Sequence, residues 1–151
     1  KEKSEAYDDV GYITFSPDSN LLAYEVEIDG KWYIVCGKEK SEPYDDAGYL
    51  TFSPDGKKLA YIAEIDGKWY VVCGKEKSEP YDYVSWITFS PDGRQLAYIA
   101  KIDDKWYVVC GKEKSEPYDD VSWITFSPDG KKLAYATIEG NECWKRIMKV
   151  E

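Results

Sequence analysis

Paired carboxylates are the groups in this sequence most able to do chemistry. Asp45-Asp46 is one such pair, and similar acidic positions return every 37 residues. Two carboxylates can act as general acid and base in glycoside hydrolysis, or supply oxygen ligands to Ca²⁺. A catalytic site is normally unique, whereas these pairs repeat, and they lack the spaced ligand series of a calcium loop. We therefore expect a protein that is not an enzyme, with no catalytic residue, no metal site and no cofactor.

Histidine is absent from the 151 residues, which excludes Ser-His-Asp and Cys-His catalysis and histidine-based metal sites. Cys36, Cys73 and Cys110 are 37 residues apart, a spacing that matches no zinc-binding pattern. We expect them to be small buried apolar groups, and Cys143, which falls outside their register, to be more exposed. Unpaired thiols favour a reducing, cytoplasmic compartment, although they do not fix the location.

The chain carries 20 Lys plus Arg against 29 Asp plus Glu, for a net charge of −9. Because phosphate binding needs clustered basic residues, we expect no nucleic-acid partner. No apolar run is long enough to cross a membrane, so we expect no membrane partner either. Aromatic residues make up 16% of the chain, which indicates a folded domain despite the high charge.

A repeat positions all of these groups. The tripeptide Ser-Pro-Asp begins at Ser16, Ser53, Ser90 and Ser127, always 37 residues apart. This spacing predicts a single repeat domain over residues 1–151. Its parts are an initial outer strand at 1–10 and four copies near 11–47, 48–84, 85–121 and 122–151. Copies this similar indicate recent amplification or engineering, between which the sequence does not decide.

The second copy shows what each repeat builds. Its β-branched and aromatic segments predict four short strands at residues 48–52, 59–63, 69–73 and 79–81. Pro80 lacks an N–H group, so the last strand should lie at a sheet edge. Ser53-Pro54-Asp55-Gly56 predicts a type I turn, and Asp66-Gly67 predicts a tight hairpin.

The second and third strands are apolar on both faces, so each sheet must be covered on both sides. Four antiparallel strands in about forty residues then favour an all-β fold, a β-propeller whose blades pack face to face. A β-solenoid is the structural alternative, but its coils are usually shorter and lack three hairpin turns in each unit.

The segment 51–61, Thr-Phe-Ser-Pro-Asp-Gly-Lys-Lys-Leu-Ala-Tyr, resembles the WD40-like PD40 repeat of TolB-type propellers. The match recurs at residues 14–24, 88–98 and 125–135, so it covers all four copies. The resemblance implies the propeller fold but not the peptidase activity of some family members, because this chain has no nucleophile motif. It also lacks the Trp-Asp and Gly-His dipeptides of true WD40 repeats. TolB-type relatives are often periplasmic.

The ends of the repeat suggest how the ring is sealed. Residues 1–10, including Glu5-Ala6-Tyr7, match an outer strand without its own blade, and the chain ends after a third strand near residues 144–150. One chain could close as a four-bladed ring, or two chains could exchange outer strands in an eight-bladed ring. Four blades need a wide wedge between sheets that prefer close alignment, so we favour the dimer, a homo-oligomer.

Loops of a propeller alternate between two faces, and we expect one of these to carry most of the net negative charge. This acidic face comprises Asp8, Asp9, Asp45, Asp46, Asp82, Asp119 and Asp120 from one loop class, with Glu27, Asp29, Glu64, Asp66, Asp103 and Asp104 from the other. The opposite face carries Lys57, Lys58, Arg94, Lys131 and Lys132. Such asymmetry suits a basic peptide or a small cation, although charged loops also serve simple solubility.

The second and third copies differ at five consecutive positions, residues 46–50 and 83–87. In a propeller these positions would lie beside the central channel of the ring. Aromatic side chains there would form a collar at Tyr12, Tyr49, Trp86 and Trp123. With Asp9, Asp46, Asp82 and Asp120 they make a candidate ligand site. The competing interpretation, which we favour, is that these rings only fill the wedge between blades. We also expect core positions for Trp32, Trp69, Trp106 and Trp144.

Two functions are compatible with these features of the sequence. The first is a non-enzymatic, self-assembling propeller scaffold whose main partner is a second copy of itself. The second is a binding module that takes a basic peptide or a small cationic ligand at its acidic, aromatic face.

Overall fold

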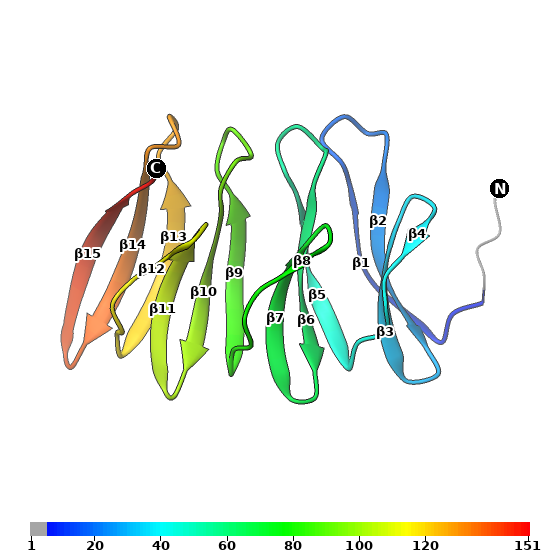
Figure 1. Cartoon of the computed structure of the whole chain (residues 1–151), viewed down its shortest axis with the longest axis horizontal. Coiled ribbons are helices and arrows are strands. Elements are labelled where there is room, and N and C mark those ends of the chain that lie inside the picture. The colour runs from blue at the N-terminus through cyan, green and yellow to red at the C-terminus, as the bar shows by residue number, and fades with distance from the viewer. Residues whose placement is uncertain (1–5) are drawn as a thin grey trace.

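The computed structural model describes residues 6–151, which form four antiparallel sheets (Figure 1). We call each sheet a blade. The first blade contains β1 (Asp9–Phe15), β2 (Leu22–Ile28), β3 (Lys31–Cys36) and β4 (Glu39–Lys40). The second contains β5 (Asp46–Phe52), β6 (Leu59–Ile65), β7 (Lys68–Cys73) and β8 (Glu76–Lys77). The third contains β9 (Tyr83–Phe89), β10 (Leu96–Ile102), β11 (Lys105–Cys110) and β12 (Glu113–Lys114). The fourth has three strands, β13 (Asp120–Phe126), β14 (Lys132–Glu139) and β15 (Glu142–Lys149).

The turns inside a blade follow the expected chemistry. The Gly56 N–H donates to the Ser53 carbonyl over 2.8 Å, and Gly56 has a φ of 71°. The Ser53 hydroxyl also donates to the Asp55 carboxylate over 2.6 Å, so side chains reinforce the turn. Asp66 and Gly67 have φ values of 52° and 75°, the left-handed pair that a two-residue hairpin requires.

The outer strand begins earlier than the sequence predicts. We expected it at residues 79–81, but β8 comprises Glu76 and Lys77. Ser78 prolongs the pairing, because its N–H donates to the Val71 carbonyl and its hydroxyl accepts the Val71 N–H, both at 2.9 Å. The next proline interrupts the ladder, which resumes where Tyr81 exchanges two backbone hydrogen bonds of 2.9 Å with Trp69.

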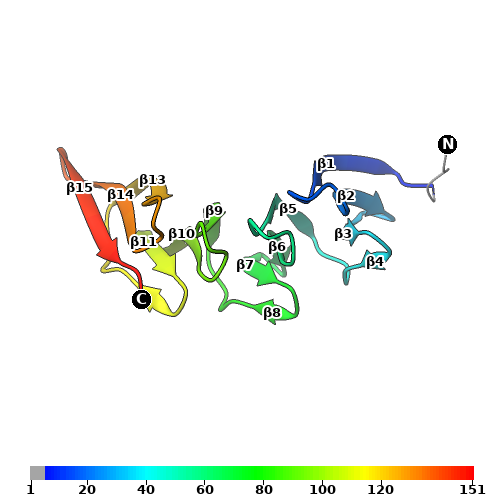
Figure 2. The same cartoon turned by 90° about the horizontal axis from the view of Figure 1, so that it is seen from above.

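The four blades stand side by side in an open arc, with the first and fourth blades at opposite ends (Figures 1 and 2). Among the described residues, no strand of the first blade contacts a strand of the fourth. The closed four-bladed ring that we considered is therefore not the arrangement of this structure. The described residues contain no helix long and apolar enough to cross a membrane.

The N-terminal segment is only partly described, and Glu5 lies outside the described residues. We call the first strand of each blade, which is β1, β5, β9 or β13, its inner strand. The expected outer strand at 1–10 is too long, because Asp9 and Val10 already belong to β1. Tyr7 lies with its ring centroid 6.4 Å from that of Tyr24. Outer-strand tyrosines pack in the same way on the following blade, as Tyr44 does on Tyr61 at 5.9 Å. Tyr7 thus occupies the place of an outer-strand residue from a preceding blade.

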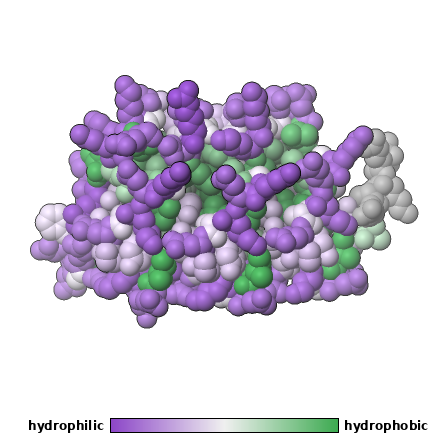
Figure 3. Space-filling view, in the orientation of Figure 1, coloured by the Kyte–Doolittle hydropathy of each residue, from purple (hydrophilic) through white to green (hydrophobic). Residues whose placement is uncertain are grey.

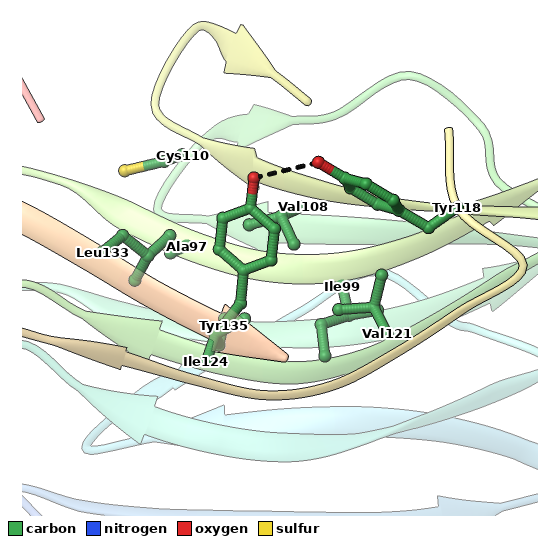
Figure 4. Packing of buried hydrophobic residues seen from close by; sticks show 9 residues of the cluster. All are labelled: Ala97, Ile99, Val108, Cys110, Tyr118, Val121, Ile124, Leu133 and Tyr135. Atoms are coloured by element: carbon green, nitrogen blue, oxygen red, sulfur yellow. Dashed lines mark hydrogen bonds between the residues drawn. The ribbon is translucent and has the colours of Figure 1, made fainter. Parts of the chain in front are cut away.

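The hydrophobic core lies between blades. Three clusters fill the three blade interfaces, and Figure 4 shows the one between the third and fourth blades. Val108 and Ile99 from the third blade meet Val121 from the fourth, and these side chains are at most 6% exposed. Burial of each such side chain stabilises the fold by about 1.5–3 kcal/mol. The hydroxyls of Tyr118 and Tyr135 form a hydrogen bond of 3.3 Å across this interface.

Candidate functional site

Most of the acidic face is occupied by structural contacts. Asp82 illustrates the arrangement, since one carboxylate oxygen accepts a 2.5 Å hydrogen bond from the Lys68 ammonium and the other accepts the Asp103 N–H at 2.8 Å. The bond from Lys68 lowers the pKa of Asp82. Asp82 therefore ties the second blade to a hairpin of the third. Its role in the structure is to link blades, which differs from the ligand-binding role that the sequence suggested.

The same clamp recurs at two other blade interfaces. Asp45 joins Lys31 to the Asp66 N–H, and Asp119 joins Lys105 to the Gly140 N–H. These bonds connect the two loop classes, so both lie on one face of the arc, as the sequence predicts.

Three other candidate carboxylates lie at the start of inner strands. Asp9, Asp46 and Asp120 each accept the N–H of the following residue, at 2.8, 2.8 and 2.9 Å. In the third blade Tyr83 replaces this aspartate. These carboxylates fix the backbone at the start of the strand and lie near the solvent, whereas Asp82 is one of the clamp residues.

The collar residues are exposed, not packed. The exposed fractions of Tyr12, Tyr49, Trp86 and Trp123 are 59%, 56%, 41% and 67%. The interpretation that these rings fill the wedge between blades is therefore wrong. Each lies at a β-bulge of the inner strand, where the pairing register shifts. A bulge turns an extra residue out of the ladder, which explains why a ring on an inner strand can face solvent.

The exposed rings form a row across the four inner strands, with one ring on each strand. Trp86 and Trp123 make a T-shaped contact with centroids 4.4 Å apart. Tyr12 and Tyr49 line one shallow hollow together with Leu50. We call these four rings the aromatic row. Tyr49, Trp86 and Trp123 have φ values of 53–55°, a left-handed conformation that is unusual for bulky residues.

The repeated tryptophans of the third strands behave as expected in three blades. Trp32, Trp69 and Trp106 are partly buried against the core clusters. The expectation for Trp144 is wrong, because this residue is 46% exposed. Cys143 pairs with Ile138 in the place where Trp69 pairs with Glu64. Trp144 is thus one residue out of register, and a shift of one residue moves a side chain to the other face of a strand.

The prediction of buried cysteines is confirmed for Cys110, and the prediction of a more exposed Cys143 is confirmed as well. Cys110 is buried, Cys36 and Cys73 are partly buried, and Cys143 is exposed. Burial raises the pKa of the Cys110 thiol to about 11, so it is a poor nucleophile at neutral pH. Cys73 lines both of two furrows between blades, as does Lys58. Figure 3 shows apolar side chains in such furrows beneath a hydrophilic outer surface.

Glu25 is a further candidate that reasoning from the sequence missed. It is only 8% exposed, and one carboxylate oxygen accepts the Tyr12 N–H at 3.0 Å. Burial raises the pKa of this carboxyl, and the nearby charge of Asp46 raises it further. A signal was available in the repeat, because the equivalent positions hold Ile62, Ile99 and Ala136.

Comparison with solved structures identifies the fold. The β-propeller domain of the Trilobed protease from Pyrococcus furiosus aligns with a TM-score of 0.56 at 15% identity, over 96% of this chain and 59% of that one. A putative 6-phosphogluconolactonase from Bacteroides uniformis gives 0.52 at 15% identity, over 94% and 55%. The Cps50 (Swd1) propeller domain from Myceliophteria thermophila gives 0.52 at 14%, over 94% and 51%.

These similarities show a β-propeller fold and no particular activity, because the identities are low. The chain spans about half the length of these structures, 51–59%. No protein-family model matches the sequence, and no curated protein matches it.

Proposed function

We propose that the chain is a non-enzymatic propeller scaffold that assembles with a second copy of itself through the two ends of its arc. The observation that carries this proposal is an uncovered apolar face. We call the side of the first blade that carries Val10, Ile13 and Phe15 the leading face. These residues are 52%, 56% and 64% exposed, whereas Val84 and Ile124, which lie at matching positions in later blades, are 0% and 4% exposed.

The chain itself supplies a template for what covers this face. In each of the three internal interfaces, such a leading face packs against the preceding blade. The preceding blade also contributes an outer-strand tyrosine, and Tyr7 already lies where that tyrosine would be. A blade from a second copy would therefore meet a surface that is shaped for one.

The other end of the arc offers a blade with an open side. We call the outward side of the fourth blade, which includes Ile138 and Ile147, the trailing face. These residues are 38% and 58% exposed, and the blade lacks an outer strand. Two copies joined leading face to trailing face would bury both pairs of ends in a closed ring of eight blades. Head-to-tail contacts that close in this way give a ring instead of a filament.

The acidic face supports a structural role over a catalytic one. Asp45, Asp82 and Asp119 are engaged in clamps between blades, so they are not free to serve as acid and base. These clamps recur at every internal interface, as contacts that hold blades together should, whereas a catalytic pair needs one asymmetric site.

Sedimentation velocity at two protein concentrations tests the proposal. We expect a species with twice the chain mass, whose fraction grows with concentration. Ile13→Asp places a carboxylate in the leading face and should abolish this species, because an unpaired charge would have to be buried. Lys75→Gln, at an exposed loop position, lowers the net charge equally and should leave assembly unchanged. A wild-type chain that stays single at both concentrations, or a dimer that survives Ile13→Asp, contradicts the proposal.

A further inference from the structure

A buried carboxylate breaks the pattern of the repeat. Among residues 6–151, Glu25 is the only charged side chain that is buried, at 8% exposure. The matching residues of the other blades are Ile62, Ile99 and Ala136, so an apolar residue fits this position. A buried charge is unfavourable unless it is paired or hydrogen-bonded. Residues that break a local rule in this way are concentrated at functional sites.

The residues around Glu25 leave space for its carboxylate, and only one of its two oxygens accepts a hydrogen bond from them. Oε2 accepts the Tyr12 N–H at 3.0 Å, while Oε1 accepts no hydrogen bond from the described residues. A Cβ atom on Gly11 would lie 2.2 Å from Oε2, so a side chain there would displace the Glu25 carboxylate from this position. A Cβ atom on Gly48 would lie 3.6 Å from Oε1. The third and fourth blades, which lack the glutamate, have serine in place of these glycines.

The charges around Glu25 are unbalanced. Asp46, at the start of β5, is close enough to raise the pKa of the Glu25 carboxyl further. Glu25 takes part in no ion pair within the described part of the chain. Two exposed rings, Tyr12 and Tyr49, follow the two glycines directly in sequence and line one hollow. Carboxylates beside aromatic rings attract a cation by charge and by its interaction with the ring faces.

We propose that the Glu25 carboxylate, which lies next to Gly11 and Gly48, binds a single guanidinium group, with the rings of Tyr12 and Tyr49 beside it. A guanidinium is planar and stacks on aromatic rings, and its N–H donors can reach Glu25 Oε1 while the opposite edge faces Asp46. An ammonium is more strongly hydrated and makes no flat contact with a ring, so it should bind less well. This site lies within one chain, and it depends on no contact with a second copy.

The test is titration with N-acetyl-arginine amide, followed through the backbone amide signals of Gly11, Tyr12 and Gly48 in two-dimensional NMR. We expect saturable shifts with a dissociation constant of about 1 mM, typical of one well-placed group with an affinity near 4 kcal/mol. N-acetyl-lysine amide should bind more weakly, and the uncharged citrulline analogue should not bind. A short peptide with one internal arginine should shift the same amide signals.

Matched variants separate the site from general attraction to an acidic protein. Glu25→Gln keeps the shape and should weaken binding about tenfold, as loss of a charge-assisted hydrogen bond does. Glu64→Gln removes the same charge from a partly buried position on β6 and should change the affinity less than about twofold. Gly48→Ser places its Cβ atom at ordinary contact distance, so it should fold and still weaken binding. Absence of saturable shifts in the wild type, or equal effects of Glu25→Gln and Glu64→Gln, overturns the proposal.

Discussion

Single residues are most informative where one copy of the repeat departs from the others. Glu25 stands where the other copies have isoleucine or alanine. The bulge of β1 also differs from those of the other inner strands, since Tyr12 lacks the left-handed φ of Tyr49, Trp86 and Trp123. The carboxylate takes the Tyr12 N–H that the distorted ladder leaves free. Sequence reasoning missed this residue because one glutamate among 29 acidic residues looks like an ordinary surface charge.

Replacing Glu25 should stabilise the fold in a manner that depends on pH. The folded-state pKa of Glu25 is raised above its ordinary value of 4.5, so folding favours the protonated form. Glu25 therefore lowers the free energy of unfolding least at low pH, and this destabilisation increases as the pH rises through the folded-state pKa. Glu25→Ile should increase the free energy of unfolding by about 1 kcal/mol at neutral pH, and by less near pH 4. Urea unfolding at both pH values measures this, and an equal effect at both would contradict it.

At the level of elements, the hydrophobic pattern predicts the three long strands of each blade well. Residues 59–63 and 69–73 lie within β6 and β7, and the hairpin between them has the expected turn. The outer strand was placed too late because Glu76 and Lys77 are polar and exposed, and an exposed edge leaves no apolar pattern to detect. For the collar rings we favoured packing over exposure for a related reason, since a bulge shifts the alternation on which burial is predicted.

The hairpin of the third blade provides a test of this turn chemistry. Asp104 has a φ of 60° at the position where the first two blades have Gly30 and Gly67. Asp104→Gly should stabilise the protein by about 0.5–1 kcal/mol, because glycine adopts a left-handed φ without strain. Its ion pair with Lys101 is exposed, so losing it matters little. Gly67→Asp is the reciprocal variant and should destabilise by a similar amount; equal midpoints of thermal unfolding for all three proteins would contradict the argument.

At the level of the whole molecule, the repeat explains the propeller fold, whereas the ring closure that we propose depends on the two ends of the arc. The leading face keeps the apolar residues of the internal interfaces, whereas the trailing face has diverged. Glu142 stands where Lys31, Lys68 and Lys105 make clamps, and Lys145 replaces Val71. Terminal repeats often carry a more polar outer face. This divergence should weaken the contact between copies compared with the internal interfaces.

Restoring the clamp lysine tests this interpretation of the trailing face. In the proposed dimer, Glu142 would face Asp8, whose described contacts include no cation. Glu142→Lys should replace this repulsion by the pair seen three times within the chain. Dimerisation should tighten by about 1 kcal/mol, or roughly fivefold, because the pair is exposed. Sedimentation equilibrium measures the change, which should shrink in high salt; weaker dimerisation of the variant would contradict this placement.

A cross-link between the ends tests ring closure most directly. Trp69 and Tyr81 form a hydrogen-bonded antiparallel pair, and their counterparts at the open ends are Cys143 and Tyr7. Residues paired in this way have Cα atoms about 5.5 Å apart, within the range that a disulfide spans. Under mild oxidation, Tyr7→Cys should form a covalent dimer through Cys143, and Tyr7→Cys with Cys143→Ser should not. A disulfide confined to one chain, or no cross-link at concentrations that give the dimer, would contradict a ring of two exchanged copies.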